Sequence, residues 1–367
     1  MRHALLTLAT ACSFRGPALA PADGDLSPDA IVVPACVGAA CDRVRIAIHH
    51  ELVAAPLTDF PVLLHVTGLA GAAPTGFDLV FTDGVTRLAY ERERFSGGDL
   101  LAWVAVPALS AATDTILYLY SGDPNPTVDQ QDPTHVWDAH FEGVWHLDGT
   151  ARGSADVVDA TSHADHGTDI GNPMLGVPGK IGGAVGFDGI DDGLDIPASP
   201  GLGLAGTTGT ISLWVRWAMS NKPTSQRLLM TSNTFAGDGN GYEWAINNLD
   251  YYYFYPADAG AENYLASLDP FLDTAWHLAA LTLDLAARSV GMFVDGRRLS
   301  PVIDNLPQWW TRTATSGDWL WGGGPTRRLF EGAMDELHVS STVRSDAWLT
   351  TEWNDQHDPD AFAAITR

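Results

Sequence analysis

The nine residues from 209 to 217 have the sequence GTISLWVRW, and they decide the fold class. From the third position on, every second residue of this stretch is apolar, which gives a β-strand one apolar face. The apolar positions are Ile211, Leu213, Val215 and Trp217. Further apolar runs cover 276–285 and 290–294, and the Asp295-Gly296 pair that follows is typical of a two-residue hairpin turn. This part of the chain is therefore predicted to be antiparallel β structure.

Residues 43–125 show the same kind of pattern on a smaller scale. Short β-rich runs recur at intervals of roughly ten to fifteen residues, the first at 44–48 and the last at 115–120. The turn-rich stretch GDPNP at 122–126 ends the series. We therefore predict a small antiparallel β-sandwich over 43–125.

A second β domain is predicted over 136–357, with a helix at its C-terminal end. Helical pattern is scarce in the chain, and the best candidate covers 345–354. Ser345 is a suitable N-cap for this helix, and Leu349 and Trp353 are spaced to contact each other on one side of it. The residues after the helix are expected to form a loose tail.

The composition supports a folded, turn-rich β protein and narrows its partners. The chain has 367 residues, of which 46% are apolar and 18% charged, enough for about two to three domains with real cores. The 37 Gly, the 22 Pro and the excess of Asp over Glu, 36 against 9, favour turns over helices. The net charge of −25 argues against a nucleic-acid partner, because nucleic acids bind to basic surfaces.

The first twelve residues are typical of an export signal. A basic start at 1–3 is followed by a short apolar run at 4–11 and then by Cys12. The sequence LATAC at 8–12 is similar to a bacterial lipoprotein signal, in which the Cys becomes lipidated. We expect residues 1–12 to be a lipoprotein-type signal and the protein to be an outer-membrane or cell-surface lipoprotein. The alternative is a cleaved secretory signal, a secreted protein and a spare Cys12.

Residues 13–42 are expected to be a tether that contains a small disulfide. The stretch is rich in Pro, Ala, Asp and Gly. Cys36 and Cys41 have no second Cys or His pair nearby that would complete a zinc site, and a local disulfide suits an exported chain. No later stretch approaches the 18 apolar residues of a membrane-spanning helix, so membrane contact is expected only through the lipid anchor.

Four short motifs in the second domain carry a family resemblance. They are KIGGAVGFDGIDDGLDIP at 180–197, WHLA at 276–279, VDG at 294–296 and GAMDEL at 332–337. They resemble the laminin-G-like, concanavalin A-like jelly-roll modules of bacterial surface proteins. The resemblance implies a jelly roll and a cell-surface setting, and it implies no particular activity.

The preceding segment resembles a domain of unknown function that often comes before such modules in secreted bacterial proteins. The residues that carry the similarity include LTDFPV at 57–62, DLVFTD at 78–83, WVAVP at 103–107 and YLYSG at 118–122. The two resemblances together predict an all-β protein with two antiparallel sandwich domains, the second a concanavalin A-like, laminin-G-like jelly roll.

A calcium site is expected at the loop DGIDDG, residues 188–193. Its three carboxylates lie on a tight turn, and Ca²⁺ takes six to eight oxygen ligands, so a second segment has to contribute. The resemblance also implies calcium on this kind of module. The expected ligands are Asp188, Asp191 or Asp192 together with Asp335 of the closing strand. The alternative is that these residues only cap turns by binding backbone amides.

Two groups of aromatic residues are candidates for ligand binding. In the run YYYFY at 251–255, Tyr251 and Tyr253 share one strand face, which is able to stack on sugar rings if it is exposed. Trp309 and Trp310 lie in a predicted loop. The alternative for both groups is that they belong to the sandwich core.

No catalytic pattern is evident in the sequence. The E-x-D-x-x-E strand motif of jelly-roll glycosidases and the G-x-S-x-G elbow are both missing. We therefore expect a non-catalytic cell-surface protein that binds a glycan or an envelope or extracellular protein. One alternative is a structural spacer or assembly component of an envelope complex. Another is a glycan hydrolase or lyase, which requires a cleft with two carboxylates at catalytic separation.

Overall fold

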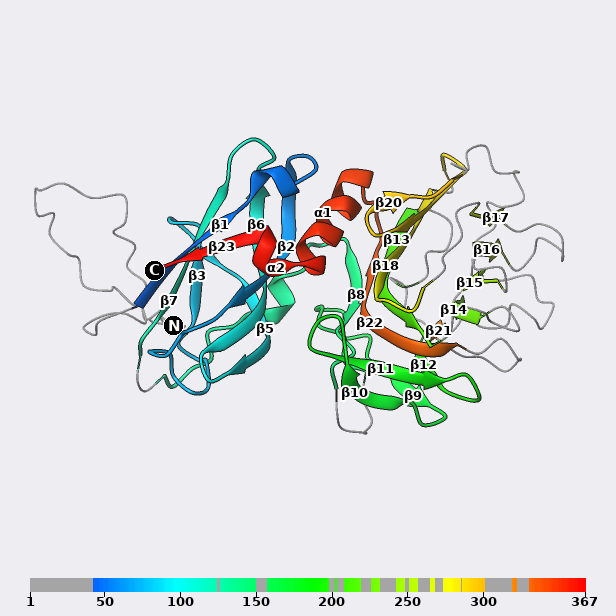
Figure 1. Cartoon of the computed structure of the whole chain (residues 1–367), viewed down its shortest axis with the longest axis horizontal. Coiled ribbons are helices and arrows are strands. Elements are labelled where there is room, and N and C mark those ends of the chain that lie inside the picture. The colour runs from blue at the N-terminus through cyan, green and yellow to red at the C-terminus, as the bar shows by residue number, and fades with distance from the viewer. Residues whose placement is uncertain are drawn as a thin grey trace, which may run out of the picture.

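The computed structural model shows two antiparallel β-sandwiches with helix α1 (Asp346–His357) between them (Figure 1). The predicted all-β fold class is therefore confirmed. The structure describes residues 42–123, 126–149, 157–197, 202, 208–218, 226–231, 242–247, 251–256, 265–267, 273–284, 286–300, 319–321 and 330–367.

The first sandwich packs a five-stranded sheet against a three-stranded sheet. The larger sheet has the order β23-β1-β7-β3-β4, with β23 (Ala363–Thr366), β1 (Asp42–Ile48), β7 (Thr115–Ser121), β3 (Val80–Thr82) and β4 (Arg87–Leu88). The smaller has the order β2-β6-β5, with β2 (Leu57–Val66), β6 (Asp99–Leu109) and β5 (Tyr90–Ser96). The short helices η2 (His50–Leu52) and η3 (Pro133–His135) lie in connections. Fully buried residues such as Ile46, Leu64 and Val104 form the common core of the two sheets.

The second sandwich packs an eight-stranded sheet against a seven-stranded one. The first sheet has the order β10-β11-β22-β13-β18-β19-β20, and β8 pairs with the C-terminal half of β22. Its strands are β8 (Phe141–Trp145), β10 (Met174–Pro178), β11 (Gly183–Asp188), β13 (Thr208–Trp217), β18 (His277–Asp284), β19 (Ser289–Val294), β20 (Arg297–Arg298) and β22 (Glu331–Ser340). The second sheet has the order β17-β16-β15-β14-β21-β12-β9. Its strands are β9 (Thr168–Ile170), β12 (Gly193–Ile196), β14 (Gln226–Thr231), β15 (Tyr242–Ile246), β16 (Tyr252–Pro256), β17 (Leu265–Ala266) and β21 (Trp319–Trp321).

The alternation predicted for residues 209–217 is present in β13. All four alternating apolar residues, Ile211, Leu213, Val215 and Trp217, are buried in the core between the two sheets. The predicted hairpin is also present, since β19 and β20 are joined by Asp295 and Gly296. Both have positive φ, 51° and 70°, which is the backbone that a two-residue type I′ turn requires.

The C-terminal segment differs from the expected loose tail. Helix α1 begins as predicted, with the Ser345 side chain accepting a hydrogen bond from Trp348 N at 3.1 Å. A short helix α2 (Pro359–Phe362) and then β23 follow, and β23 pairs antiparallel with β1 at the edge of the first sandwich. The edge strand β1 gains a partner in this way, and Phe362 is fully buried in the first core. Within the described residues, no helix is long and apolar enough to cross a membrane.

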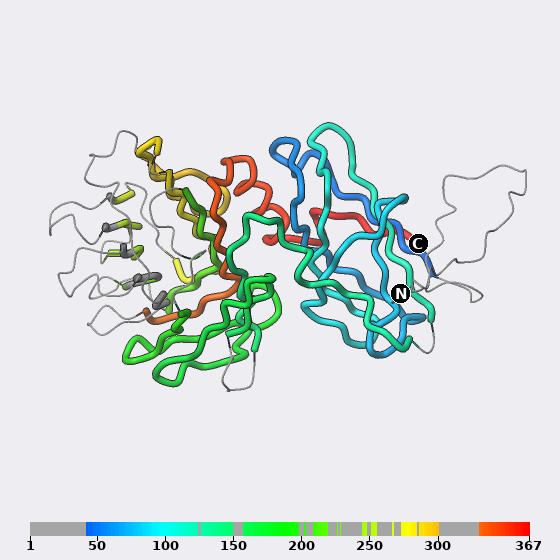
Figure 2. The backbone as a smooth tube through the Cα atoms, turned by 180° about the vertical axis from the view of Figure 1, so that it is seen from behind, coloured from blue at the N-terminus to red at the C-terminus, as the bar shows by residue number. Residues whose placement is uncertain are grey.

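One buried apolar cluster, which we call the shared core, joins the first sandwich to the outer face of the jelly-roll sheet, and it is separate from the core between the two jelly-roll sheets. Phe60 and Trp103 of the first sandwich lie in the same buried cluster as Trp214 and Leu278 on the outer face of the jelly-roll sheet. Trp348 of α1 belongs to this cluster too, and its ring lies 4.7 Å from that of Phe60. The view from behind also shows α1 between the two halves (Figure 2). This sheet therefore has two buried faces, one toward its own partner sheet and one toward the first domain.

We predict that Phe362→Ala destabilises the protein by about 3 to 5 kcal/mol, because it empties a fully buried site that holds β23 onto the first domain. Denaturant unfolding of the full chain measures the change. The control is Val85→Ala at an exposed site, which should change the free energy of unfolding by less than about 0.5 kcal/mol. Equal stability of Phe362→Ala and the control would contradict the docking of the C-terminal segment.

Candidate functional site

Three carboxylates meet in the turn that connects β11 of one jelly-roll sheet to β12 of the other. Asp188, Asp191 and Asp192 each offer an oxygen, and these atoms all lie within 4.8 Å of one another. The turn is held by its own side chains: Asp192 accepts from Asp188 N at 2.9 Å, and Asp188 accepts from Ile190 N at 2.7 Å. Gly189, with φ at +73°, supplies the left-handed residue that the turn needs. The structure thus brings these three residues together on one tight turn.

The electrostatics of this turn favour a bound cation. Burial raises the pKa of the Asp192 carboxyl, and the negative charges of Asp188 and Asp191 raise it further, against hydrogen bonds from backbone amides. Asp188 and Asp191 are exposed, so the group is open to solvent. Carboxylate oxygens are the ligands that Ca²⁺ prefers. The arrangement is therefore able to offer three charged ligands to a hard cation from one side.

Asp335 lies outside this group. In the β11–β22 ladder, Asp188 pairs with Glu331, four residues before Asp335. Asp335 instead pairs with Trp214 across the β13–β22 ladder and shares its outer sheet face. Its carboxylate accepts hydrogen bonds from Lys180 N at 2.7 Å and Ile181 N at 2.9 Å, and it is completely buried. Asp335 thus holds the turn between β10 and β11, which is the turn-capping alternative rather than the fourth ligand.

The aromatic run on β16 is mostly core. Tyr252 and Phe254 are buried between the jelly-roll sheets, and Tyr253 is only 6% exposed, whereas Tyr251 is partly exposed. Tyr253 therefore does not present the open stacking face that sugar binding requires. Trp309 and Trp310, as well as Cys12, Cys36 and Cys41, lie outside the described residues.

A second polar group, which the sequence analysis did not identify, lies between the two sandwiches. Its centre is His146, directly after β8. Nδ1 of His146 lies 2.9 Å from Oε2 of Glu336 on β22 and 3.4 Å from Oε2 of Glu93 on β5. Its Nε2 lies 3.4 Å from Oε2 of Glu91 on the same strand as Glu93. One imidazole thus contacts carboxylates of both domains, and we call these four residues the interdomain cluster.

The surroundings of the interdomain cluster are apolar and aromatic. The ring of Trp103 stacks on His146 with centroids 6.0 Å apart, and Trp137 packs against both. A second buried histidine, His338, bridges Glu336 at 3.2 Å and Glu352 of α1 at 3.3 Å. The polar network therefore runs from β5 through β22 to α1 inside the shared core.

Burial and mutual attraction shift the pKa values of this cluster strongly. Burial raises the pKa of Glu93 to about 8, although the neighbouring His146 opposes the shift. Burial would lower the pKa of His146, but the charges of Glu336, Glu93 and Glu91 hold it well above its ordinary value. His146 and His338 lower the pKa of Glu336 despite its complete burial. The cluster therefore favours a positive charge at its centre.

A small cavity opens beside the interdomain cluster. It has a volume of about 160 Å³, and charged residues of both domains, among them Glu91, Glu93, His146 and Asp148, line it. Arg92 also lines it, but its guanidinium binds both carboxylate oxygens of Asp129 at 2.6 and 2.5 Å. Pockets for organic ligands usually have at least about 300 Å³, so this cavity suits ions and water.

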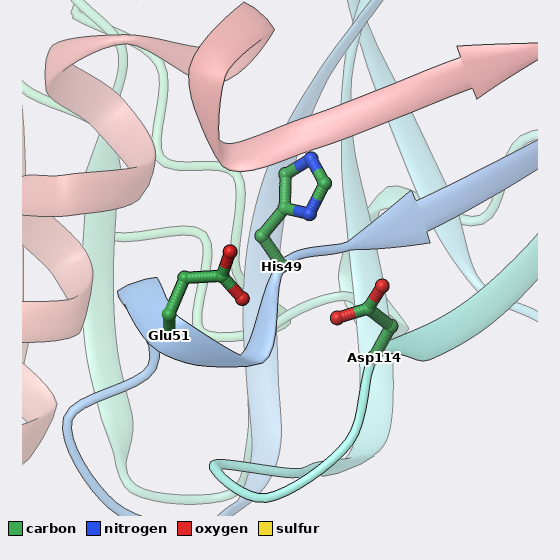
Figure 3. Close-up of side chains that lie close together, drawn as sticks. All are labelled: His49, Glu51 and Asp114. Atoms are coloured by element: carbon green, nitrogen blue, oxygen red, sulfur yellow. The ribbon is translucent and has the colours of Figure 1, made fainter.

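A third group of possible metal ligands lies on the surface of the first sandwich (Figure 3). His49 and Glu51 come from the start of η2, and Asp114 comes from the turn before β7, with ligand atoms within 4.8 Å of one another. The Asp114 carboxylate already accepts from His50 N at 3.2 Å and lies 2.7 Å from Nδ1 of His50. Asp114 is thus already paired with His50 at the surface, and His49 lies beside this pair.

The motif residues in WHLA and VDG have a structural role. Nδ1 of His277 lies 2.7 Å from Asp295 Oδ2, and its Nε2 lies 2.8 Å from Asp273. Asp295 also accepts from Leu278 N at 3.1 Å, so it ties the β19–β20 turn to the start of β18. The residues of these motifs therefore stabilise the β19–β20 hairpin rather than form a binding site.

The sequence contains a weak signal for the interdomain cluster. Glu91 and Glu93 alternate with arginines on one strand, and Glu336 lies within the GAMDEL motif. Their meeting depends on contacts between residues 190 positions apart, such as His146 with Glu336. No local pattern in the sequence predicts such a contact.

The family model described as the concanavalin A-like lectin/glucanases superfamily matches residues 187–350. This match lies within the second sandwich and agrees with its two antiparallel sheets. The second sandwich is therefore a concanavalin A-like jelly roll, and the resemblance predicted from the motifs is confirmed. No curated protein matches the sequence.

Several solved structures are similar to this chain at low sequence identity. Domain 4 of AbnA, an extracellular arabinanase from Geobacillus stearothermophilus in complex with arabinotriose, is 18% identical, with a TM-score of 0.42, over 57% of this chain and 97% of that one. The binding domain of botulinum neurotoxin serotype D/C is 11% identical, with a TM-score of 0.46, over 59% and 52%. A complex of such a domain with rat synaptotagmin II is 10% identical, with a TM-score of 0.45, over 59% and 52%. The alignment thus spans about half the length of these neurotoxin chains.

We predict that Asp335→Ala lowers the free energy of unfolding by about 2 to 4 kcal/mol, because two buried backbone amides lose their acceptor. Asp335→Asn keeps an acceptor oxygen at the same place and should lose clearly less. Denaturant unfolding of both variants measures the difference. Equal losses would show that the charge of Asp335, rather than its hydrogen bonds, stabilises the turn.

A second prediction concerns the pH dependence of stability at His277. Burial lowers the pKa of His277, but its hydrogen bonds to Asp295 and Asp273 raise it more, so the folded-state pKa lies above the ordinary value. A raised folded-state pKa contributes stability that is complete below the unfolded-state pKa and is lost as the pH rises through the folded-state pKa. His277→Gln should therefore destabilise the protein more at about pH 5.5 than at about pH 8.5. Denaturant unfolding at both pH values, with the exposed His135→Gln as control, tests this, and an equal loss at both would refute it.

Proposed function

We propose that this protein is a non-catalytic binding protein that recognises a glycan or a surface or extracellular protein through a calcium-stabilised edge of its jelly roll. The observation that carries the proposal is the group of Asp188, Asp191 and Asp192 on an open turn of a concanavalin A-like module. The acidic chain does not suit a nucleic-acid partner, and calcium on this turn would offset most of the turn's own negative charge.

The calcium ligands of this proposal are the three carboxylates of the turn, with backbone carbonyls and water completing the shell. The neighbouring turn after β9 supports this, because Gly171 lies against the backbone of Asp191 so closely that a Cβ there would meet the Asp191 carbonyl oxygen at 2.4 Å. The two turns therefore pack against each other and keep the carboxylates together. A cation bound there would also offset the mutual repulsion of the three charges.

Two observations favour binding over catalysis. Glycoside hydrolysis needs two carboxylates that flank a bound sugar in a cleft. In the described part of the chain, carboxylates line the cavity between the two domains. Its volume of about 160 Å³ is too small for an oligosaccharide. The outer face of the jelly-roll sheet is covered by the first domain. The exposed turns at the edge of the jelly roll, among them the turn of Asp188, offer a contact surface.

The setting of this proposal is the cell surface or the extracellular space. The proposal also includes a lipoprotein-type signal with lipid on Cys12 and a disulfide between Cys36 and Cys41. A second candidate function is a rigid spacer or assembly component of an envelope complex. The shared core between the first sandwich and the outer face of the jelly-roll sheet favours it, because a large apolar contact restricts the relative motion of two domains.

We predict that Ca²⁺ raises the melting temperature of the protein relative to chelator, because a ligand that binds only the folded state stabilises it by mass action. Asp191→Asn, which removes one exposed charged ligand, should abolish most of the shift. Asp335→Asn is the matched control and should keep the shift, since Asp335 lies outside the turn. A shift that is absent in the unmodified protein, or that persists in Asp191→Asn, would rule out this calcium site.

The same variants test recognition on glycan arrays with Ca²⁺ present. Binding by the unmodified protein that is lost in Asp191→Asn would support a calcium-dependent glycan site. If no glycan binds and Ca²⁺ still raises the melting temperature, the proposed partner is a protein instead. Binding that is independent of both calcium and Asp191 would show that recognition uses another surface.

A further inference from the structure

We propose that the interdomain cluster binds a divalent transition-metal ion such as Zn²⁺. The bound ion would join the two domains. Glu93, His146 and Glu336 would be its protein ligands. The proposal is independent of the calcium turn and of the glycan or protein partner proposed above.

The geometry of the three residues is that of a preformed ligand set. A carboxylate oxygen of Glu93, a ring nitrogen of His146 and a carboxylate oxygen of Glu336 all lie within 4.8 Å of one another. They come from three separate elements: β5 of the first sandwich, the segment after β8, and β22 of the jelly roll. A positive φ of 49° at Glu336 accompanies a shift of register between β13 and β22, which interrupts the regular alternation of side chains there.

The second observation is that the cluster holds buried polar atoms without hydrogen-bond partners. Oε1 of Glu93 and Oε1 of Glu336 are both buried and unpaired, and the side chains of these residues are 1% and 0% exposed. Nε2 of His146 also has no hydrogen bond, although Glu91 lies 3.4 Å from it. An unpaired buried carboxylate oxygen is costly, so such atoms point to a ligand that satisfies them.

The charge of the cluster points to the same kind of ligand. In the part of the chain that the structure describes, every ion pair of Glu91, Glu93 and Glu336 is with a histidine, either His146 or His338. Arg92, the cation beside the cavity, is bound to Asp129. The carboxylates of the cluster therefore have no permanent positive charge of their own, and a divalent ion would supply it.

The donor set selects the class of metal. Imidazole nitrogen with carboxylate oxygens suits Zn²⁺ and related first-row ions, whereas Ca²⁺ takes oxygen ligands. The cavity of about 160 Å³ beside His146 has room for water ligands, and Glu91 and Asp148 on its wall are able to bind them. The interdomain cluster and the Asp188 turn should therefore prefer different ions.

The test must separate this site from the surface group of His49, Glu51 and Asp114, which also contains a histidine and two carboxylates. Isothermal titration of the chelator-treated full chain with Zn²⁺ gives the affinity and the number of sites. Glu93→Gln keeps the shape of the side chain and removes one ligand charge, and it should weaken zinc binding about tenfold or more. His49→Gln is the matched control and should leave the affinity of the main site unchanged. Both variants are compared with the unmodified chain by circular dichroism to confirm folding.

Three results would overturn the proposal: zinc does not bind, Glu93→Gln binds zinc as tightly as the unmodified chain, or binding is lost in His49→Gln. If Glu93→Gln fails to fold, anomalous scattering at the zinc edge from zinc-soaked crystals of the unmodified chain decides the matter. A peak between Glu93 and His146 would support the proposal. A peak only at His49, or no peak, would refute it. The effect of Ca²⁺ on the melting temperature, with and without Asp191→Asn, is measured separately. Failure of one proposal therefore does not affect the other.

Discussion

The outer face of strand β22 is covered by the first domain, and much of the structure depends on this burial. Met334, Leu337 and Val339 point into the jelly-roll core, while Asp335 and His338 point toward the first domain. A sheet face that would meet water in an isolated jelly roll is here placed against Trp103, Trp137 and α1. A buried polar group on that face costs several kcal/mol if it stays unpaired, so these groups depend on partners within the protein or on a bound ligand.

The partners that these groups find explain the arrangement of the C-terminal segment. Ser212 donates to Glu352 at 2.8 Å, and the Trp214 indole donates to Gln356 at 2.6 Å, so α1 satisfies the outer face of β13. The chain then continues through α2 into β23, which completes the sheet of the first sandwich. The strand β23 thus belongs to the same sandwich as β1, and the two domains cannot separate without breaking this polar layer.

Local patterns in the sequence predicted several of the elements, and long-range contacts decided the rest. The alternation at 211–217, the Asp295-Gly296 turn and the Ser345 cap each depend on a few neighbouring residues, and all are present. The pairing of β23 with β1 joins residues more than 300 positions apart, so the tail looked unconstrained. Alternation left open whether one face of the Tyr251 run is exposed or belongs to the core, and both Tyr252 and Tyr253 are buried. The position of Asp335 follows from the register of β22, which residue spacing does not reveal.

The scarcity of fixed positive charge explains why histidines lie at the centre of the interdomain cluster. The chain has 20 Lys and Arg against 45 Asp and Glu. Several arginines are bound to single carboxylates, as in the pairs Arg92–Asp129, Arg298–Asp346 and Arg344–Asp138. The buried carboxylates between the domains are left to His146 and His338, whose charge exists only when they carry a proton. The buried carboxylates of Glu93 and Glu336 between the two domains therefore depend on a proton or a bound cation for their compensating charge.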